Sequence, residues 1–134
     1  MNGLSSTIFL GFFGFGKSKD PSNTDSKASK PKPRNISARE AKAVMDKGEP
    51  YTLVDVRSGD EFSDGHIKGA ILIPVDEIGS RAETKLPDKN AVILVYCASG
   101  ARSSRASKIL AGMGYTNVNN FGGIMGWPYG TVSG

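Results

Sequence analysis

The chain has 134 residues, enough for one globular domain, and its formal net charge is +4. The positive excess comes from residues 17–35, where six Lys and Arg face two Asp, whereas from residue 36 onward eleven Lys and Arg face eleven Asp and Glu. The neutral charge of residues 36–134 argues against a nucleic-acid partner. The chain has one Cys and one His, which excludes an internal disulfide and a cysteine-based zinc cluster. We therefore expect no metal and no cofactor.

Residues 1–35 divide into an apolar segment and a basic linker. The apolar run at residues 8–15 is far shorter than the about 20 residues that span a bilayer, and it lacks the basic start and cleavage site of a secretory signal. Contact with a membrane surface is one interpretation of this run, and docking on the body or on a partner is another. Residues 17–35 hold no apolar side chain larger than Ala28, so we expect a disordered linker. The predicted domain is therefore 36–134, in a cytoplasmic protein whose only candidate membrane contact is the apolar run.

The first half of the domain begins with a helix signal. Ser37 and Glu40 have the spacing of a capping box, and the helix that they start is expected to end at Gly48. The next elements are predicted in the order buried strand, helical turn with loop, strand and helix: 51–56, 60–66, 70–73 and 75–82.

The second half contains the most apolar strand, residues 91–96, followed by a helix at 103–113, a strand at 118–121 and a turn at 122–127. Strands that alternate with helices predict an α/β fold, a doubly wound sheet of about five mostly parallel strands with helices on both faces. Ligands of such sheets bind beyond the carboxyl ends of the strands. Strand 91–96 leads there directly into Cys97, which makes this thiol the candidate functional group.

The loop after Cys97 has the composition of an anion site. Four small residues let the backbone curl and direct its N–H groups to one point, and a helix start behind them favours negative charge. This field, with Arg102, is expected to lower the pKa of the Cys97 thiol and make it a nucleophile. The plainer interpretations are a core cysteine and a surface arginine. The candidate site residues of this segment are Cys97, Ala98, Ser99, Gly100, Ala101, Arg102 and Ser103.

This segment resembles the active-site loop of rhodanese-like sulfurtransferases. Other matching motifs follow in the family's order: Asp55-Val-Arg57, Glu61-Phe62 with Gly65-His-Ile67 and Gly69-Ala70, and Gly122-Gly-Ile-Met-Gly-Trp127. The resemblance covers about residues 36–128 and implies a rhodanese-like fold with Cys97 as nucleophile and residues 98–103 as the substrate loop. Asp55 and Arg57 are interpreted as a supporting pair that braces this loop, and His66 as structural.

The resemblance also implies a mechanism. The Cys97 thiolate attacks the outer sulfur of a donor such as thiosulfate, releases sulfite and keeps the sulfur as a persulfide, which cyanide, a thiol or a protein acceptor then removes. Arg102 would bind the oxyanion end of the donor or orient the loop. Because Ala98 and Ala101 add no second positive charge, high activity on thiosulfate is in doubt, and a small-thiol or protein-bound persulfide becomes a candidate donor.

Two other functions are weighed against this one. A non-enzymatic or partner-dependent sulfur-carrier or binding module would have the same fold, but the retained Cys97 argues against an inactive domain. Related phosphatases and arsenate reductases have five residues between Cys and Arg. The four residues between Cys97 and Arg102, and the absence of a second Cys, argue against that chemistry.

Overall fold

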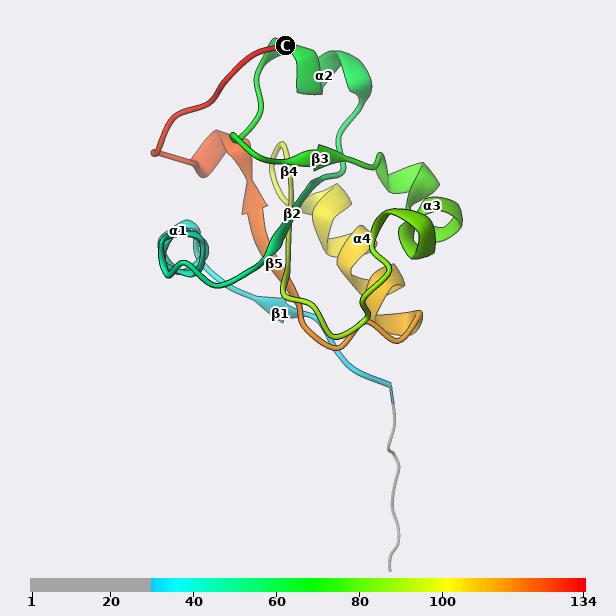
Figure 1. The fold of residues 1–134 in the computed structure, drawn as a ribbon. Helices are drawn as coiled ribbons and strands as arrows, with labels where there is room; N and C mark the ends of the chain where they lie inside the picture. Colours follow the sequence, from blue (N-terminus) through cyan, green and yellow to red (C-terminus); the bar gives the residue numbers. More distant parts are fainter. Residues whose placement is uncertain (1–29) are drawn as a thin grey trace, which may run out of the picture. The chain divides into compact units, whose positions relative to one another are not determined.

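Residues 30–134 are described by a computed structural model, in which five parallel strands form one sheet in the order β1-β5-β4-β2-β3 (Figure 1). The strands are β1 (Arg34–Asn35), β2 (Thr52–Asp55), β3 (Ile71–Leu72), β4 (Ile93–Cys97) and β5 (Val118–Gly123). The α-helices are α1 (Ala38–Asp46), α2 (Gly59–Asp64), α3 (Ile78–Lys85) and α4 (Ala101–Gly112), and the 3-10 turns are η1 (Val75–Glu77) and η2 (Ile124–Gly126). The predicted α/β sheet of about five parallel strands is confirmed.

Helices cover both faces of the sheet, α1 on one side and α3 with α4 on the other (Figure 1). The alternation of side chains along β4 explains this arrangement. Leu94 and Tyr96 pack in the cluster that contains Ala41 of α1, whereas Ile93 and the other odd-numbered residues of β4 pack toward α3 and α4. All five residues of β4 are buried, as a central parallel strand covered on both faces requires.

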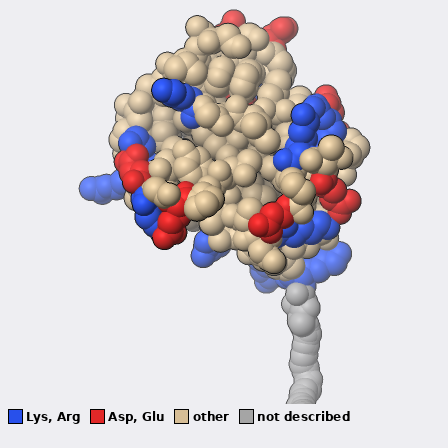
Figure 2. Space-filling view, viewed as in Figure 1, with Lys and Arg blue, Asp and Glu red and all other residues tan. Residues whose placement is uncertain are grey.

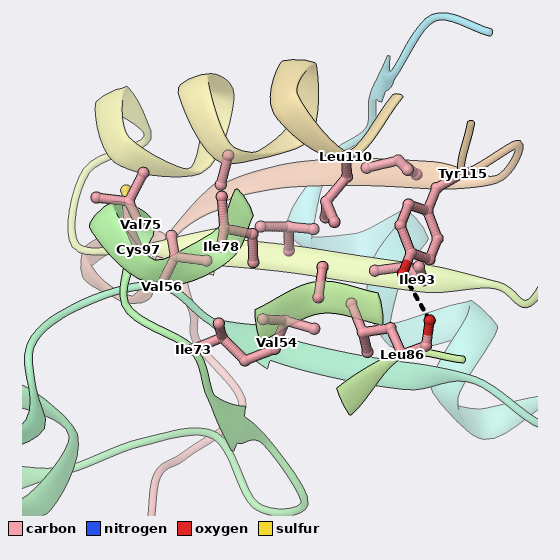
Figure 3. Close-up of a cluster of buried hydrophobic side chains, with 14 residues drawn as sticks. Val54, Val56, Ile73, Val75, Ile78, Leu86, Ile93, Cys97, Leu110 and Tyr115 are labelled. Atoms are coloured by element: carbon pink, nitrogen blue, oxygen red, sulfur yellow. Dashed lines mark hydrogen bonds between the residues drawn. The ribbon is translucent and has the colours of Figure 1, made fainter. Parts of the chain in front are cut away.

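The core between the sheet and the α3–α4 layer has Cys97 at one end (Figure 3). Val56 and Val75 lie beside the cysteine there. Tyr115 lies at the opposite end, where its buried hydroxyl donates to the carbonyl oxygen of Leu86 at 2.6 Å. Cys97 is thus anchored by a packed apolar core at the carboxyl end of β4.

The start of the domain differs from the sequence prediction. Arg34 and Asn35 were expected to end the disordered linker, but they form β1, which pairs with Asn119 and Asn120 of β5. The Arg34 Nε also donates to Asn119 Oδ1 at 3.0 Å. A two-residue polar strand has no apolar periodicity, so the sequence carries no local signal for it. The apolar run at 8–15 and most of the linker lie outside the described residues. Within residues 30–134 no helix is long and apolar enough to cross a membrane.

Two helices begin differently from the prediction. α2 starts with its own capping box, in which Ser58 Oγ accepts from the Glu61 N–H at 3.2 Å and Glu61 Oε1 accepts from the Ser58 N–H at 3.0 Å. α4 begins at Ala101, two residues before the predicted start. Gly100 precedes it at a φ of +117°, a left-handed conformation that favours glycine. The last residues of the Cys97 loop therefore belong to the first turn of α4.

Candidate active site

Cys97 is both the last residue of β4 and the first residue of the loop. The parallel pairing of β4 with β5 shifts between Val95 and Cys97, so that Cys97 is opposite Gly123. Such an irregularity bends the strand and redirects the side chains that follow it. Cys97 is 1% exposed, so its sulfur is buried where the strand ends.

Hydrogen-bond donors surround the Cys97 sulfur. The Gly100 N–H donates to Sγ at 3.0 Å, and the Ser103 Oγ lies 3.5 Å from it. Burial alone would raise the pKa of this thiol. The Ser103 hydroxyl and the N–H groups of Ser103, Gly100 and Ser99 act in the opposite direction and leave the pKa below its ordinary value. These hydrogen bonds make the Cys97 thiol more acidic.

Glycines of β5 let this strand approach the loop closely. A Cβ on Gly123 would overlap the Ala98 carbonyl group and would lie 2.6 Å from the Ser99 nitrogen. Directly after β5, the Met125 N–H donates to the Ala98 carbonyl oxygen at 3.1 Å. The sequence predicts only a turn at 122–127. The structure shows that Gly123 in addition determines where the Cys97 loop can lie.

Ser103 links the loop to β5. Its side chain is buried, and its Oγ lies 2.7 Å from Asn120 Oδ1, 3.1 Å from the Gly100 carbonyl oxygen and 3.0 Å from that of Gly122. Ser103 is among the residues predicted from the sequence for this site, and Asn120 is not. The available signal was an amide in the middle of a predicted strand, because a polar side chain that packs in a sheet needs hydrogen-bond partners.

Arg102 forms a two-point ion pair with Glu61 of α2. Its two terminal nitrogens donate to the two carboxylate oxygens at 2.7 and 3.0 Å, and each side chain is a little more than a third exposed. Arg102, followed by the Ser58 N–H, lowers the pKa of Glu61 to about 2. The guanidinium that was expected to bind the donor or orient the loop is therefore paired with a carboxylate that the sequence did not place in the site.

Asp55 and Arg57 form a second pair, which is buried. Arg57 Nη2 donates to Asp55 Oδ2 at 2.7 Å, and Asp55 Oδ1 accepts from both the Arg57 N–H and its Nε. The same Nη2 also donates to the carbonyl oxygen of Gly65 at 2.7 Å, between α2 and β3. The hydrogen bonds of Arg57 brace this segment, and the expected support of the Cys97 loop by the pair stays a prediction.

His66 takes part in packing. Its ring stacks on Phe62 with centroids 3.7 Å apart, and its Nδ1 lies 2.8 Å from the Phe62 carbonyl oxygen. Within residues 30–134 no group of three or more His, Cys, Asp or Glu is arranged to hold a metal ion.

A family model described as the rhodanese-like domain matches residues 37–128. The chain belongs to the rhodanese-like domain family. The match extends from the capping serine of α1 to the residue after the Gly122–Trp127 motif, and it confirms the resemblance inferred from the sequence.

Curated relatives of this rhodanese-like chain include sulfurtransferases. Thiosulfate sulfurtransferase PspE of Escherichia coli (strain K12) is 45% identical over 71 residues, which cover 53% of this chain and 68% of that protein. The putative sulfurtransferase YtwF of Bacillus subtilis (strain 168) is 35% identical over 94 residues, which cover 70% of this chain and 89% of the relative.

Solved structures share the rhodanese-like fold. A rhodanese with anions from E. coli superposes with a TM-score of 0.60 at 40% identity, covering 63% of this chain and all of the other. A rhodanese-like domain from Anabaena sp. superposes with a TM-score of 0.67 at 33% identity, covering 74% of this chain and 78% of the other. The expected rhodanese-like architecture is confirmed.

Proposed function

We propose that this rhodanese-like protein is a sulfurtransferase that carries sulfur as a persulfide on Cys97. The observation that carries the proposal is the Cys97 Sγ, held at the end of β4 with the Gly100 N–H at 3.0 Å and the Ser103 hydroxyl at 3.5 Å. These groups stabilise a thiolate before reaction and negative charge on sulfur after it. Family membership and relatives named as sulfurtransferases support the same reaction class.

The reaction has two displacement steps. In the first, the Cys97 thiolate attacks the outer sulfur of the donor, a new S–S bond forms, and the donor's S–S bond breaks with its electron pair leaving on sulfite or on a thiolate. In the second, a thiolate or cyanide attacks the outer sulfur of the persulfide, and the electron pair of the breaking bond regenerates the Cys97 thiolate. No external oxidant or reductant is needed.

The charges around the site bear on the class of donor. Thiosulfate carries two negative charges, whereas the persulfide of a small thiol has one at its reacting end. Arg102 is paired with Glu61 at 2.7 Å, and the loop side chains at Ala98 and Ala101 are uncharged. We therefore propose a small-thiol or protein-bound persulfide as the preferred donor, with thiosulfate as a weaker substrate and a thiol as acceptor.

The surface charge also bears on the class of donor. On the face shown in Figure 2, basic and acidic side chains lie close to one another and no large area carries a single sign of charge. Long-range attraction of a multiply charged donor therefore has little support from this face.

A donor panel read by mass spectrometry tests the proposal. The protein is treated with thiosulfate or with glutathione persulfide, and we expect a gain of about 32 Da on Cys97, the mass of one sulfur. A thiol or cyanide should remove the added mass. The Cys97→Ser variant is the control and should show neither the adduct nor turnover. If no donor produces the adduct in the folded wild-type protein, the proposal is wrong.

A further inference from the structure

The Ser103 hydroxyl has more polar neighbours than its one hydrogen can serve. Its Oγ is buried and lies 2.7 Å from Asn120 Oδ1, 3.0 Å from the Gly122 carbonyl oxygen, 3.1 Å from the Gly100 carbonyl oxygen and 3.5 Å from the Cys97 Sγ. The three oxygens can only accept a hydrogen bond. The direction in which this hydrogen points therefore depends on which acceptor competes best for it.

The orientation of the Asn120 amide makes its oxygen the strongest competitor. The Gly122 N–H donates to Asn120 Oδ1 at 3.0 Å, while Asn120 Nδ2 donates to Asn35 Oδ1 of β1 at 3.2 Å. Exchanging the amide oxygen and nitrogen would place two N–H groups opposite each other at Gly122, so the hydrogen-bond pattern itself assigns the oxygen. The side chain is buried between α4 and the sheet edge, and its oxygen has the shortest contact with Ser103.

We propose that Asn120 is a positioning residue that holds the Ser103 hydroxyl hydrogen while Cys97 is a thiol and gives it up when Cys97 becomes a thiolate. In the thiol form, the S–H donates to Ser103 Oγ and the Ser103 hydrogen points to Asn120. Once the thiol proton has left to water, Sγ is an acceptor only, and the hydroxyl turns toward it. Asn120 Oδ1 then keeps its bond from the Gly122 N–H. The inference rests on the proposed use of the Cys97 thiolate.

The charged groups around the site are paired, so they remain the same when Asn120 is changed. Arg102 of α4, which interacts electrostatically with Cys97, is held by Glu61 of α2. Asp55 and Arg57 bind each other beside β2. At the start of η1, Asp76 contacts Arg105 of α4 at 3.4 Å. A change in the acidity of Cys97 on substituting Asn120 would therefore report on the Ser103 hydrogen bond.

The test measures the pKa of Cys97 from the pH dependence of its alkylation by iodoacetamide. Asn120→Ala should lower this pKa by roughly 0.5–1, the effect of one neutral hydrogen bond, because the thiolate no longer competes with the amide oxygen. Asn120→Asp should raise it, because a carboxylate holds the hydrogen more strongly and adds negative charge. In a Ser103→Ala background, Asn120→Ala should have no effect. Asn119→Ala is the matched control and should leave the pKa unchanged.

Opposite shifts in the two Asn120 variants separate positioning from a general loss of structure. Shifts in the same direction, or an Asn120→Ala shift that persists without the Ser103 hydroxyl, would overturn the proposal. If Asn120→Ala does not fold, the pKa of Cys97 in Asn120→Asp is the test. A lower Cys97 pKa in that variant would overturn the proposal. Alkylation needs no sulfur donor. A failed sulfur-transfer assay together with the expected alkylation pattern would thus reject the proposed function and leave this inference standing.

Discussion

Arg102 and Glu61, 41 residues apart in the chain, face each other with both terminal guanidinium nitrogens donating to both carboxylate oxygens at 2.7 and 3.0 Å. The pair joins α2 to the first turn of α4, directly beyond the Cys97 loop. A cation in the first turn of a helix opposes the helix dipole, and the carboxylate compensates for that cost. The same carboxylate would compete with an anionic donor if Arg102 were to bind one.

Glu61→Gln should therefore improve the use of thiosulfate. A glutamine can keep the capping box at the start of α2 but carries no charge, so Arg102 becomes available to a dianion. We expect KM for thiosulfate to fall about 2- to 5-fold, the equivalent of about 0.5–1 kcal/mol for a partly exposed charge. Steady-state kinetics with cyanide as acceptor measure this change.

The matched control for this experiment is Glu77→Gln. Glu77, the last residue of η1, pairs with Arg81 of α3 through a single 2.7 Å contact, and both side chains are exposed. Glu77→Gln should leave the KM for thiosulfate unchanged. A KM for thiosulfate that stays the same or rises in Glu61→Gln would show that Arg102 does not receive the donor.

The Glu61 carboxylate also makes stability depend on pH in the acid range. Arg102 lowers the pKa of Glu61 from 4.5 to about 2 in the folded protein, so the unfolded chain binds its proton at higher pH. The stabilisation is complete above about pH 4.5 and is lost as the pH falls toward 2. Because the pair is about a third exposed, we expect about 0.5–1 kcal/mol. Urea denaturation at pH 6 and at pH 3 should show a smaller loss in Glu61→Gln than in the wild type, and equal losses would contradict the assignment.

Removing one charge of the buried Arg57–Asp55 pair without the other should strongly destabilise the protein. Asp55 has no exposed surface and Arg57 is 6% exposed. Arg57→Met leaves a buried carboxylate without its partner and should lower the free energy of unfolding by about 3–5 kcal/mol. Adding Asp55→Asn removes that charge and should recover at least about 1 kcal/mol.

Chemical denaturation of the single and double variants measures these changes. Lys42→Met, at an exposed ion pair with Asp46 on α1, is the control and should change stability by less than about 0.5 kcal/mol. A double variant no more stable than Arg57→Met would mean that the cost comes from lost packing rather than from the uncompensated charge.

The parts of this fold that could be predicted from the sequence depend on local patterns. The Ser37–Glu40 capping box begins α1, and the continuous apolar run of β4 leads to Cys97. The parts that were missed depend on residues far apart in the chain. The Arg102–Glu61 pair spans 41 positions, and the Asn120 amide contacts Ser103 across 17. Such contacts follow from how α2, α4 and β5 converge, which no local periodicity encodes.

Gly123→Ala should damage the site more than any other single methyl group added to a described glycine. A Cβ there would overlap the Ala98 carbonyl and lie 2.6 Å from the Ser99 nitrogen, both of which are backbone groups that cannot rotate away. The loop would have to move off β5, and the N–H groups around Sγ would move with it. We expect a loss of about 1–3 kcal/mol of stability and a larger proportional loss of sulfur loading on Cys97.

Gly126→Ala, three residues later, is the matched control because its Cβ would meet nothing within 4 Å. Thermal denaturation and the mass gain on Cys97 are measured for both variants. If the close approach of the backbone explains the need for glycine at 123, only Gly123→Ala should lose stability and sulfur loading. Equal behaviour of the two variants would reject that explanation.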